Sequence, residues 1–329
     1  MSAFKSSRLF GTPALAAALC WSLLASGQEP TTSGGTLRVD VNVVNIFCTV
    51  KNKHGALVTD LAKTDFEVFE DGKKQEIKYF TRETDRPLTL ALLVDTSGSQ
   101  EAVLAVEKDS ATQFLRQVLR PSDLSLLITF DLSVDLLQDF TSDADRLEEA
   151  LRRARINAAG PPPGVQGPFP VKGTIGTRLY DAVYLASREK LGQEVGRKAI
   201  ILISDGEDFG SNVKEEEALE AAQRSDTMIY AIGIADPQLY QMAFGRPYRG
   251  DEVLKKLARE TGGRAIFPRK ISDLPAAFDQ IAAELRSQYS LGYTPTNSAR
   301  DGRYRKLEVK LKRNGLRVQA RRGYYAPGS

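Results

Sequence analysis

The 329-residue chain has almost no histidine or cysteine, the residues from which catalytic triads and zinc or copper sites are most often built. Its single histidine is His54, in the turn-like stretch KNKHGAL, and its two cysteines are Cys20 and Cys48. A Ser-His-Asp triad is therefore not expected. The chain also lacks a G-x-x-x-x-G-K phosphate loop, and we expect no enzymatic activity.

The chain has no strong excess of charge of either sign. It contains 45 Lys and Arg against 42 Asp and Glu, a formal net charge of +3, so no overall field steers it towards nucleic acid. The basic residues gather at 300–322, where the only acids are Asp301 and Glu308. This stretch fits a solvated strand face, or a surface that docks onto an acidic partner or an anionic envelope surface. No aromatic interleaving supports nucleic-acid binding.

Only the N-terminus contains an apolar stretch that raises the question of a membrane. Lys5 and Arg8 precede the apolar residues 9–24, and small residues follow at 25–27. This is the layout of a secretory signal peptide over residues 1–27, and we expect a secreted or periplasmic protein. The alternative is a retained membrane anchor, although the apolar stretch is shorter than the ~20 residues that a spanning helix needs.

Removal of that segment leaves one cysteine, Cys48, which cannot form an intramolecular disulfide. It lies in the apolar stretch VNIFCTV, so we expect a small buried side chain. Residues 28–36 are rich in Gly, Ser, Thr and Pro and predict a flexible lead.

Two segments show the patterns of β-strands. In the N-terminal segment, residues 37–86, the stretch DFEVFEDGKKQEIKYF predicts two short strands around Asp71-Gly72, a hairpin signal. In the C-terminal segment, residues 287–326, YRKLEVKLKR and LRVQARRGYY are joined by Asn314-Gly315, the favoured pair for a type I′ hairpin turn. The candidate core residues of the first segment are Phe66, Val68, Ile77 and Phe80.

Each β segment is short for an independent sheet. We therefore expect the two to pack together as one small β-sandwich, into which the region between them is inserted. The alternative is two separate flaps on that central region.

The central region, residues 87–286, alternates between apolar strands and amphipathic helices. LTLALLVD, RKAIILISD and TMIYAIGI are nearly continuous apolar stretches, as strands buried on both faces should be. Strands that alternate with helices imply parallel pairing through right-handed crossovers. We expect an α/β fold with a doubly wound, mostly parallel sheet, in which LSLLITF and VDLLQDF form an antiparallel edge hairpin. A helix over residues 101–119 should bury Val103, Val106, Phe114, Leu115 and Val118.

In a doubly wound sheet, ligands bind beyond the C-terminal ends of the strands. Oxygen-bearing side chains follow at these ends: Asp95, Ser97 and Ser99 after the first strand, Thr177 at a helix start, and Asp205 after AIILISD. Such hydroxyls and carboxylates suit a hard cation, Mg²⁺ or alternatively Mn²⁺ or Ca²⁺. The DTSGS stretch alone is also typical of a solvated turn.

Two alternatives concern the neighbours of these residues. Thr174 is a rival to Thr177, but Thr177 stands directly before the predicted helix. Glu207 and Asp208 lie close to Asp205 in the sequence and could tune the site or bind a second ion, although a solvated loop start is the reading we favour.

The combination of ALLVDTSGS, GTRLYDAVYLA, ILISDGED and IYAIGI resembles the von Willebrand factor type A (VWA) domain with its metal-ion-dependent adhesion site (MIDAS). The resemblance covers residues 88–285, and the flanking β segments are similar to those of secreted bacterial proteins of this kind. It implies that Mg²⁺ is coordinated, directly or through water, by Asp95, Ser97, Ser99, Thr177 and Asp205.

The resemblance also implies a function. We expect a metal-dependent protein-binding or adhesion module whose protein ligand supplies an Asp or Glu carboxylate to the ion. The alternative is a structural assembly factor of a cell-envelope complex that exchanges no ligand.

Overall fold

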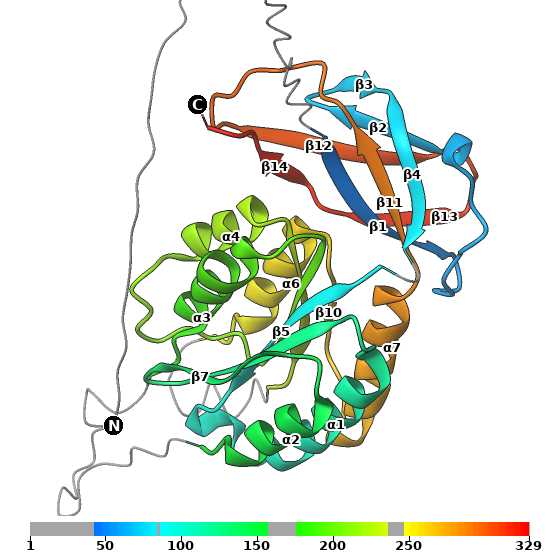
Figure 1. Cartoon of the computed structure of the whole chain (residues 1–329). Helices are drawn as coiled ribbons and strands as arrows, with labels where there is room; N and C mark the ends of the chain where they lie inside the picture. The colour runs from blue at the N-terminus through cyan, green and yellow to red at the C-terminus, as the bar shows by residue number, and fades with distance from the viewer. Residues whose placement is uncertain (1–42, 84–85, 157–175, 236–246, 329) are drawn as a thin grey trace, which may run out of the picture. The chain divides into compact units, whose positions relative to one another are not determined.

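The computed structural model describes residues 43–83, 86–156, 176–235 and 247–328 (Figure 1). The predicted signal peptide, the flexible lead and Thr174 lie outside these residues. Among the helices of the described part, none combines the length and the apolar character that a membrane span requires.

A six-stranded sheet forms the centre of the α/β region. The central strands β5, β8 and β9 are buried at every residue, which explains why the sequence shows unbroken apolar stretches there. The order is β10-β9-β8-β5-β6-β7, with only β7 antiparallel, at one edge. The bounds are β5 Leu88–Asp95, β6 Leu124–Phe130, β7 Val134–Thr141, β8 Arg197–Ser204, β9 Thr227–Gly233 and β10 Ala265–Ile266.

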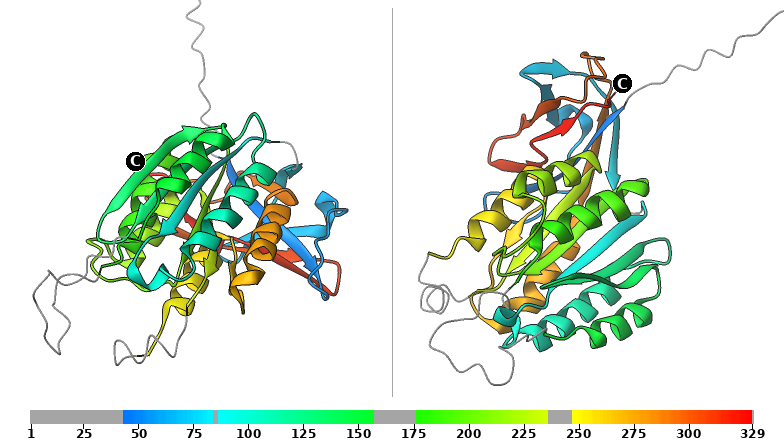
Figure 2. Two further views of the ribbon diagram at one scale, coloured as in Figure 1. Left: turned by 90° about the horizontal axis from the view of Figure 1, so that it is seen from below. Right: turned by 90° about the vertical axis from the view of Figure 1, so that its left-hand side faces the viewer.

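Helices cover both faces of this sheet (Figure 2). Alternate residues of β5 serve the two layers: Leu90 and Leu92 pack with α1, α2 and α7, whereas Ala91 and Leu93 pack with α3, α4 and α6. The doubly wound α/β prediction is confirmed. The bounds are α1 Leu104–Val118, α2 Ala144–Arg153, α3 Leu179–Leu185, α4 Glu215–Arg224, α6 Gly250–Thr261 and α7 Leu274–Leu285.

One residue of the predicted apolar face of α1 is placed differently. Val106 is exposed, whereas Leu104, Ala111 and Phe114 are buried. The buried positions of α1 follow spacings of three and four, and position 106 does not fit that series.

The order of the strands reverses between β5 and β8. From β5 the chain proceeds to β6 and β7 on one side, then returns to β8 on the other side. β5 is parallel to both neighbours, with Val94 opposite Ile203 and Thr129. The C-terminal ends of β5 and β8 therefore lie side by side at the point where doubly wound sheets bind ligands.

The terminal β segments form two four-stranded sheets around one core. The sheet orders are β13-β1-β11-β4 and β14-β12-β2-β3, and both sheets contribute to a single hydrophobic cluster that includes the buried Cys48. The predicted β-sandwich is confirmed, and the alternative of two separate flaps is wrong. The bounds are β1 Val44–Asn52, β2 Phe66–Glu70, β3 Lys73–Gln75, β4 Ile77–Glu83, β11 Gln288–Tyr293, β12 Tyr304–Leu311, β13 Leu316–Ala320 and β14 Gly323–Tyr325.

The predicted hairpin around Asn314-Gly315 is wrong. β12 pairs with β2 and β14, whereas β13 pairs with β1 in the other sheet. A type I′ turn needs positive φ at both central residues, but of this pair only Gly315 has one, at 75°. The connection therefore crosses from one sheet to the other. An alternating pattern is compatible with either arrangement, because both strands bury one face in the common core.

The hairpin predicted around Asp71-Gly72 is present but shorter than expected. Both residues have positive φ, 47° and 80°, and β2 pairs with β3 across them. The chain then leaves this sheet, and Ile77 and Phe80 belong to β4, which pairs with β11 in the other sheet.

Removal of the Phe278 ring should destabilise the protein strongly. Phe278 of α7 is 1% exposed, and its ring centroid lies 5.2 Å from that of Phe114 of α1. We expect Phe278→Ala to lower the free energy of unfolding by about 3–5 kcal/mol, measured by urea denaturation. The control Val195→Ala, at a side chain that is 90% exposed, should change it by less than about 0.5 kcal/mol. Equal effects of the two substitutions would contradict the packing of α7 against α1.

Candidate metal centre

The DTSGS loop, residues 95–99, folds back on the end of β5. Asp95 is fully buried, and its Oδ1 accepts a 2.9 Å hydrogen bond from the backbone N–H of Ser97. Its Oδ2 accepts a 2.6 Å hydrogen bond from the hydroxyl of Ser204, at the end of β8. The hydroxyl oxygens of Ser97 and Ser99 lie 3.0 Å apart. These side chains form one compact group of oxygen atoms.

Asp205 brings a second carboxylate to this group. It follows β8 directly and is 5% exposed, and its Oδ1 accepts a 3.0 Å hydrogen bond from the backbone N–H of Glu207. Against the larger effect of its burial, the side chains of Ser99 and Gln100 act to lower the pKa of Asp205. The end of β8 and the DTSGS loop are therefore linked through side chains.

The turn after Asp205 requires a glycine. Gly206 has φ of +80°, and a Cβ atom there would lie 2.4 Å from the carbonyl oxygen of Gly250, at the start of α6. The loop can pass this close to α6 only because residue 206 has no side chain.

Thr177 is held beside the same loop by backbone pairing with Phe209. The N–H of Thr177 donates to the Phe209 carbonyl at 3.1 Å, and the N–H of Phe209 donates back at 2.8 Å. Thr177 is 4% exposed. Because Phe209 follows Asp205 closely in the chain, the pairing places Thr177 next to the segment that carries Asp205.

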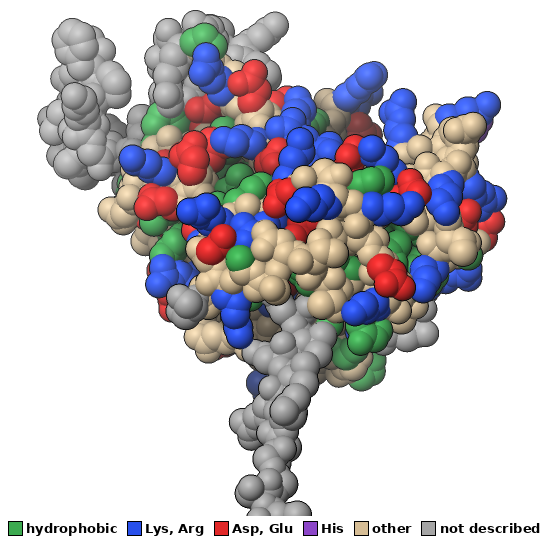
Figure 3. Space-filling view, turned by 90° about the horizontal axis from the view of Figure 1, so that it is seen from above, with side chains coloured by type: hydrophobic (Ala, Val, Ile, Leu, Met, Phe, Trp, Pro, Cys, Tyr) green, Lys and Arg blue, Asp and Glu red, His purple; other side chains and the backbone are tan. Residues whose placement is uncertain are grey.

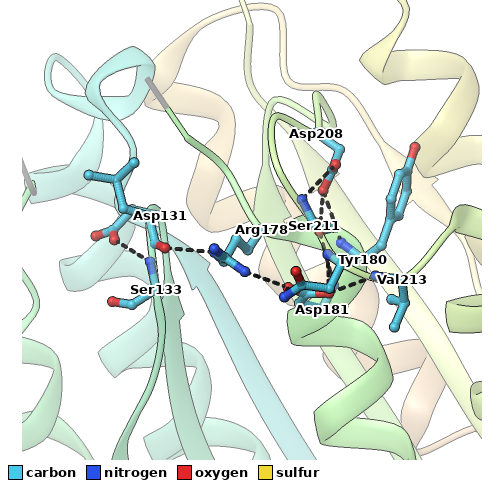
Figure 4. Close-up of polar contacts among 10 residues, drawn as sticks. Asp131, Ser133, Arg178, Tyr180, Asp181, Asp208, Ser211 and Val213 are labelled. Atoms are coloured by element: carbon cyan, nitrogen blue, oxygen red, sulfur yellow. Dashed lines mark hydrogen bonds and ion pairs between the residues drawn. The ribbon is translucent and has the colours of Figure 1, made fainter. Parts of the chain in front are cut away.

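Arg178 connects the Thr177 segment to the end of β6 (Figure 4). Its N–H donates to the Asp131 carbonyl at 2.9 Å, and its Nε donates to the Leu132 carbonyl at 2.6 Å. The Asp131 carboxylate in turn accepts a 2.8 Å hydrogen bond from the hydroxyl of Thr96, inside the DTSGS loop. Through Asp131, the segments that carry Thr177 and Asp95 are thus fixed to one another.

Asp181, in the first turn of α3, organises the loop after β8. Its carboxylate accepts hydrogen bonds from the N–H groups of Asn212 and Val213, at 2.8 and 3.0 Å, and forms a 3.0 Å ion pair with Arg178. Figure 4 shows the Asp181 carboxylate between these partners. We therefore assign Asp181 a positioning role for the loop.

Glu207 and Asp208 are not a solvated loop start, which corrects the sequence interpretation. Glu207 is 8% exposed and accepts a 2.6 Å hydrogen bond from the N–H of Arg249. Asp208 accepts hydrogen bonds from the Ser211 hydroxyl at 2.5 Å and from the N–H of Tyr180 at 3.3 Å. Both carboxylates are engaged in fixing the chain around Asp205.

The two carboxyl groups at the strand ends are electrostatically unfavourable without a cation. Burial, together with the negative charge of Asp205, raises the pKa of Asp95 to about 7. Burial and the charge of Glu207 raise the pKa of Asp205. A divalent cation would offset this repulsion and the loss of solvation, so the charge and the oxygen chemistry of these residues fit a hard metal ion.

The donor set would be poor in charge. Within the described ranges, no three His, Cys, Asp or Glu side chains form a group that could hold a metal. A cation here would therefore depend on hydroxyl oxygens in addition to Asp95 and Asp205.

Glu107 is a residue of this region that the sequence analysis missed. It lies in the first turn of α1 and is 0% exposed, and neither of its carboxyl oxygens has a hydrogen-bond partner among the described residues. Burial, followed by the negative charges of Asp95 and Asp205, holds its pKa well above the usual range. The one sequence signal of its burial is its spacing, three residues after Leu104 and four before Ala111, which places it on the buried face of α1.

Solved structures of other proteins are similar in fold. Proximal thread matrix protein 1 from the mussel byssus has a TM-score of 0.50 and 14% identity, over 66% of this chain and 51% of that chain. A second structure of that protein, whose MIDAS motif is occupied by zinc, has a TM-score of 0.44 and 14% identity, over 61% and 48%. A von Willebrand factor type A protein from Catenulispora acidiphila has a TM-score of 0.48 and 11% identity, over 89% and 75%.

No protein-family model and no curated protein matches the sequence. The likeness to the byssus protein at a TM-score of 0.50, together with the sheet order β10-β9-β8-β5-β6-β7 and helices on both faces, shows that the α/β region shares the doubly wound α/β fold of that protein.

In the absence of metal, the free energy of unfolding should fall as pH rises from about 4 to about 7. The pKa of Asp95 is about 7 in the folded chain but ~3.9 in an unfolded one. Between these values the folded chain binds more protons, so raising the pH favours unfolding. Urea titrations in EDTA at several pH values measure the slope, and Asp95→Asn should flatten it. An unchanged slope in that variant would assign the effect to other groups.

Glu107→Gln should stabilise the metal-free protein at neutral pH. The substitution keeps the shape of the side chain and removes the charge that burial disfavours. The melting temperature in EDTA should rise, by more at pH ~8 than at pH ~5, because an ordinary glutamate is ionised above ~4.3. Glu101→Gln, at an exposed position before the same helix, is the control and should change little. A lower melting temperature for Glu107→Gln would show that the carboxyl group is needed for folding.

Proposed function

We propose that this protein binds another protein through a divalent cation held by Asp95, Ser97, Ser99, Thr177 and Asp205. The observation that carries the proposal is the meeting of two buried carboxyl groups and the DTSGS hydroxyls at the reversal point of the sheet. Mg²⁺ is the cation we expect first, with Mn²⁺ or Ca²⁺ as alternatives.

The small number of charged donors defines the kind of ligand. With two carboxylates and otherwise neutral oxygens, the bound ion would keep an open coordination position that attracts a further negative oxygen. We propose that an Asp or Glu side chain of the partner protein supplies it. The chain's own residues hold the site in shape: Ser204 and the Ser97 N–H orient Asp95, and the Glu207 N–H orients Asp205.

We propose a binding role and not a catalytic one. His54 lies in an exposed turn after β1 of the sandwich, whereas Asp95 and Asp205 lie at strand ends of the α/β sheet. The candidate site itself consists of carboxylates and hydroxyls whose buried hydrogen bonds fix their positions. Such a site is suited to holding a carboxylate from another molecule.

The proposal includes the setting of the protein. We propose a secreted or periplasmic bacterial protein with a signal peptide at residues 1–27 and a flexible lead at 28–36. The VWA domain would span residues 87–286, between the β segments at 37–86 and 287–326.

Mg²⁺ binding provides the first test. Titration of Mg²⁺ into the chelator-treated protein, followed by calorimetry, should give a saturable signal that Asp95→Ala and Asp205→Ala abolish. Asp279→Ala, at an exposed position of α7, should leave the signal unchanged. Circular dichroism controls for folding. A signal that survives in folded Asp95→Ala would reject the site.

Capture of the partner provides the second part of this test. The immobilised protein, loaded with Mg²⁺, is exposed to the exported proteins of its source cell and then eluted with EDTA. We expect a partner that EDTA releases and that Asp95→Ala does not retain. A partner that stays bound in EDTA would favour the structural assembly factor.

A further inference from the structure

A second candidate binding surface lies away from the metal centre. It is a groove of about 1130 Å³ that is lined by β1, β12 and β13 of the sandwich and by α6 and the segment after it. The α6 helix begins beside Asp205, whose carbonyl accepts a 2.6 Å hydrogen bond from Tyr248. Its groove-lining residues Lys255 and Arg259 follow Gly250 by five and nine residues, so roughly 8–14 Å of helix separates them from the start of α6.

Several basic side chains of the groove are already neutralised. Lys51 of β1 and Arg264 both pair with Glu284 of α7, at 2.5 and 2.7 Å. Arg321 pairs with Asp226. The pairs of Lys51 and Arg321 connect the sandwich to the α/β region, and all three cations have little capacity left for an outside ligand.

Three other cations of the groove have no acidic partner among the described residues. Lys53, Arg317 and Arg322 line it and are exposed, and none forms an ion pair within the described part of the chain. The one acidic side chain of the described lining is Glu308, which pairs with Lys310 at 3.4 Å. The groove therefore carries uncompensated positive charge.

The face of the molecule that is seen from above differs in this respect. On the face shown in Figure 3, blue Lys and Arg side chains are interspersed with red Asp and Glu side chains. An excess of positive charge in a hollow, with acids largely absent from its walls, attracts an anionic ligand more strongly than such a mixed surface does.

The shape and lining of the groove favour a polypeptide over a lipid surface. A concave groove can enclose a narrow polypeptide segment, whereas the broad surface of a bilayer cannot enter it. Its wall contains β13, an edge strand that pairs only with β1 among the described strands, and half-buried apolar side chains, Phe267, Val309 and Val318. An extended chain can lie along an edge strand and place alternate side chains against such a wall.

We propose that this groove binds an extended, acidic segment of a partner protein, whose carboxylates meet Lys53, Arg317 and Arg322. This contact needs no metal ion. It would give the protein a second point of attachment, independent of the cation-dependent one.

The test uses a fluorescent peptide in which glutamate alternates with valine, and a matched peptide with glutamine in place of glutamate. Fluorescence anisotropy in EDTA at low salt should show binding of the glutamate peptide only. The triple variant Lys53→Glu, Arg317→Glu and Arg322→Glu should weaken it by at least about tenfold. Asp95→Ala should not change it, so this proposal and the proposed function fail separately.

The matched control changes the net charge equally outside the groove. Lys63, Lys73 and Lys78 are exposed residues of the sandwich that do not line the groove, and their triple replacement by Glu should leave most of the affinity. Equal weakening by the two triple variants would overturn the proposal. Binding to vesicles that contain an anionic phospholipid, without binding to the glutamate peptide, would overturn it in favour of a lipid surface.

Discussion

The candidate site depends on the pairing of β5 with β8. These strands are buried on both faces, so their register is fixed by the packing of two helical layers. The register brings Asp95 and Ser204 to adjacent positions, and Asp205 follows at once. The hydrophobic packing of the helices against β5 and β8 therefore buries the carboxyl groups of Asp95 and Asp205, although these groups take no part in that packing. The unfavourable electrostatics of the site follow from the way the sheet is built.

The surrounding loops are then held by polar contacts. Asp131, Arg178 and Asp181 connect the ends of β6, α3 and the segment after β8. Each is a charged side chain whose partners are mainly backbone groups, which suits loops that have no regular secondary structure of their own. The positions of Thr177 and the DTSGS loop are set by this network, in addition to the strands.

The sequence was sufficient to predict the α/β sheet, because its pattern of strands and helices leaves one solution. The sandwich was expected because each β segment is short for an independent sheet, with two separate flaps as the alternative. Unbroken apolar strands such as Leu88–Asp95 must be covered on both sides. The pairing of β12 with β13 failed as a prediction, since an alternating strand satisfies its buried face equally well in either of two facing sheets. Nothing local distinguishes a tight hairpin at Asn314-Gly315 from a crossing between sheets, except backbone dihedral angles that only the fold determines.

The candidate site was predictable in its strand-end residues and not in its supports. Asp95 and Asp205 stand where an apolar strand stops, which is visible in the sequence. Asp181 looks like an ordinary residue of a helix start and Asp208 like an ordinary loop residue, because the backbone groups that they bind lie some thirty residues away in the chain. Glu107 was missed for a related reason: a carboxylate in the first turn of a helix is expected near water, and its burial depends on the neighbouring helices.

Each sandwich sheet combines strands from the N-terminal and the C-terminal β segment, and this has a consequence for biosynthesis. β1 pairs with β11 and β13, and β2 pairs with β12. The strands that are synthesised first therefore cannot pair until strands more than two hundred residues later have been synthesised. Domains generally fold as units, and folding of the α/β region between them would bring the two β segments together. Until then the early strands have unpaired edges. A ribosome or a translocation channel that releases the chain slowly would therefore leave the N-terminal strands in need of protection until the last forty residues emerge.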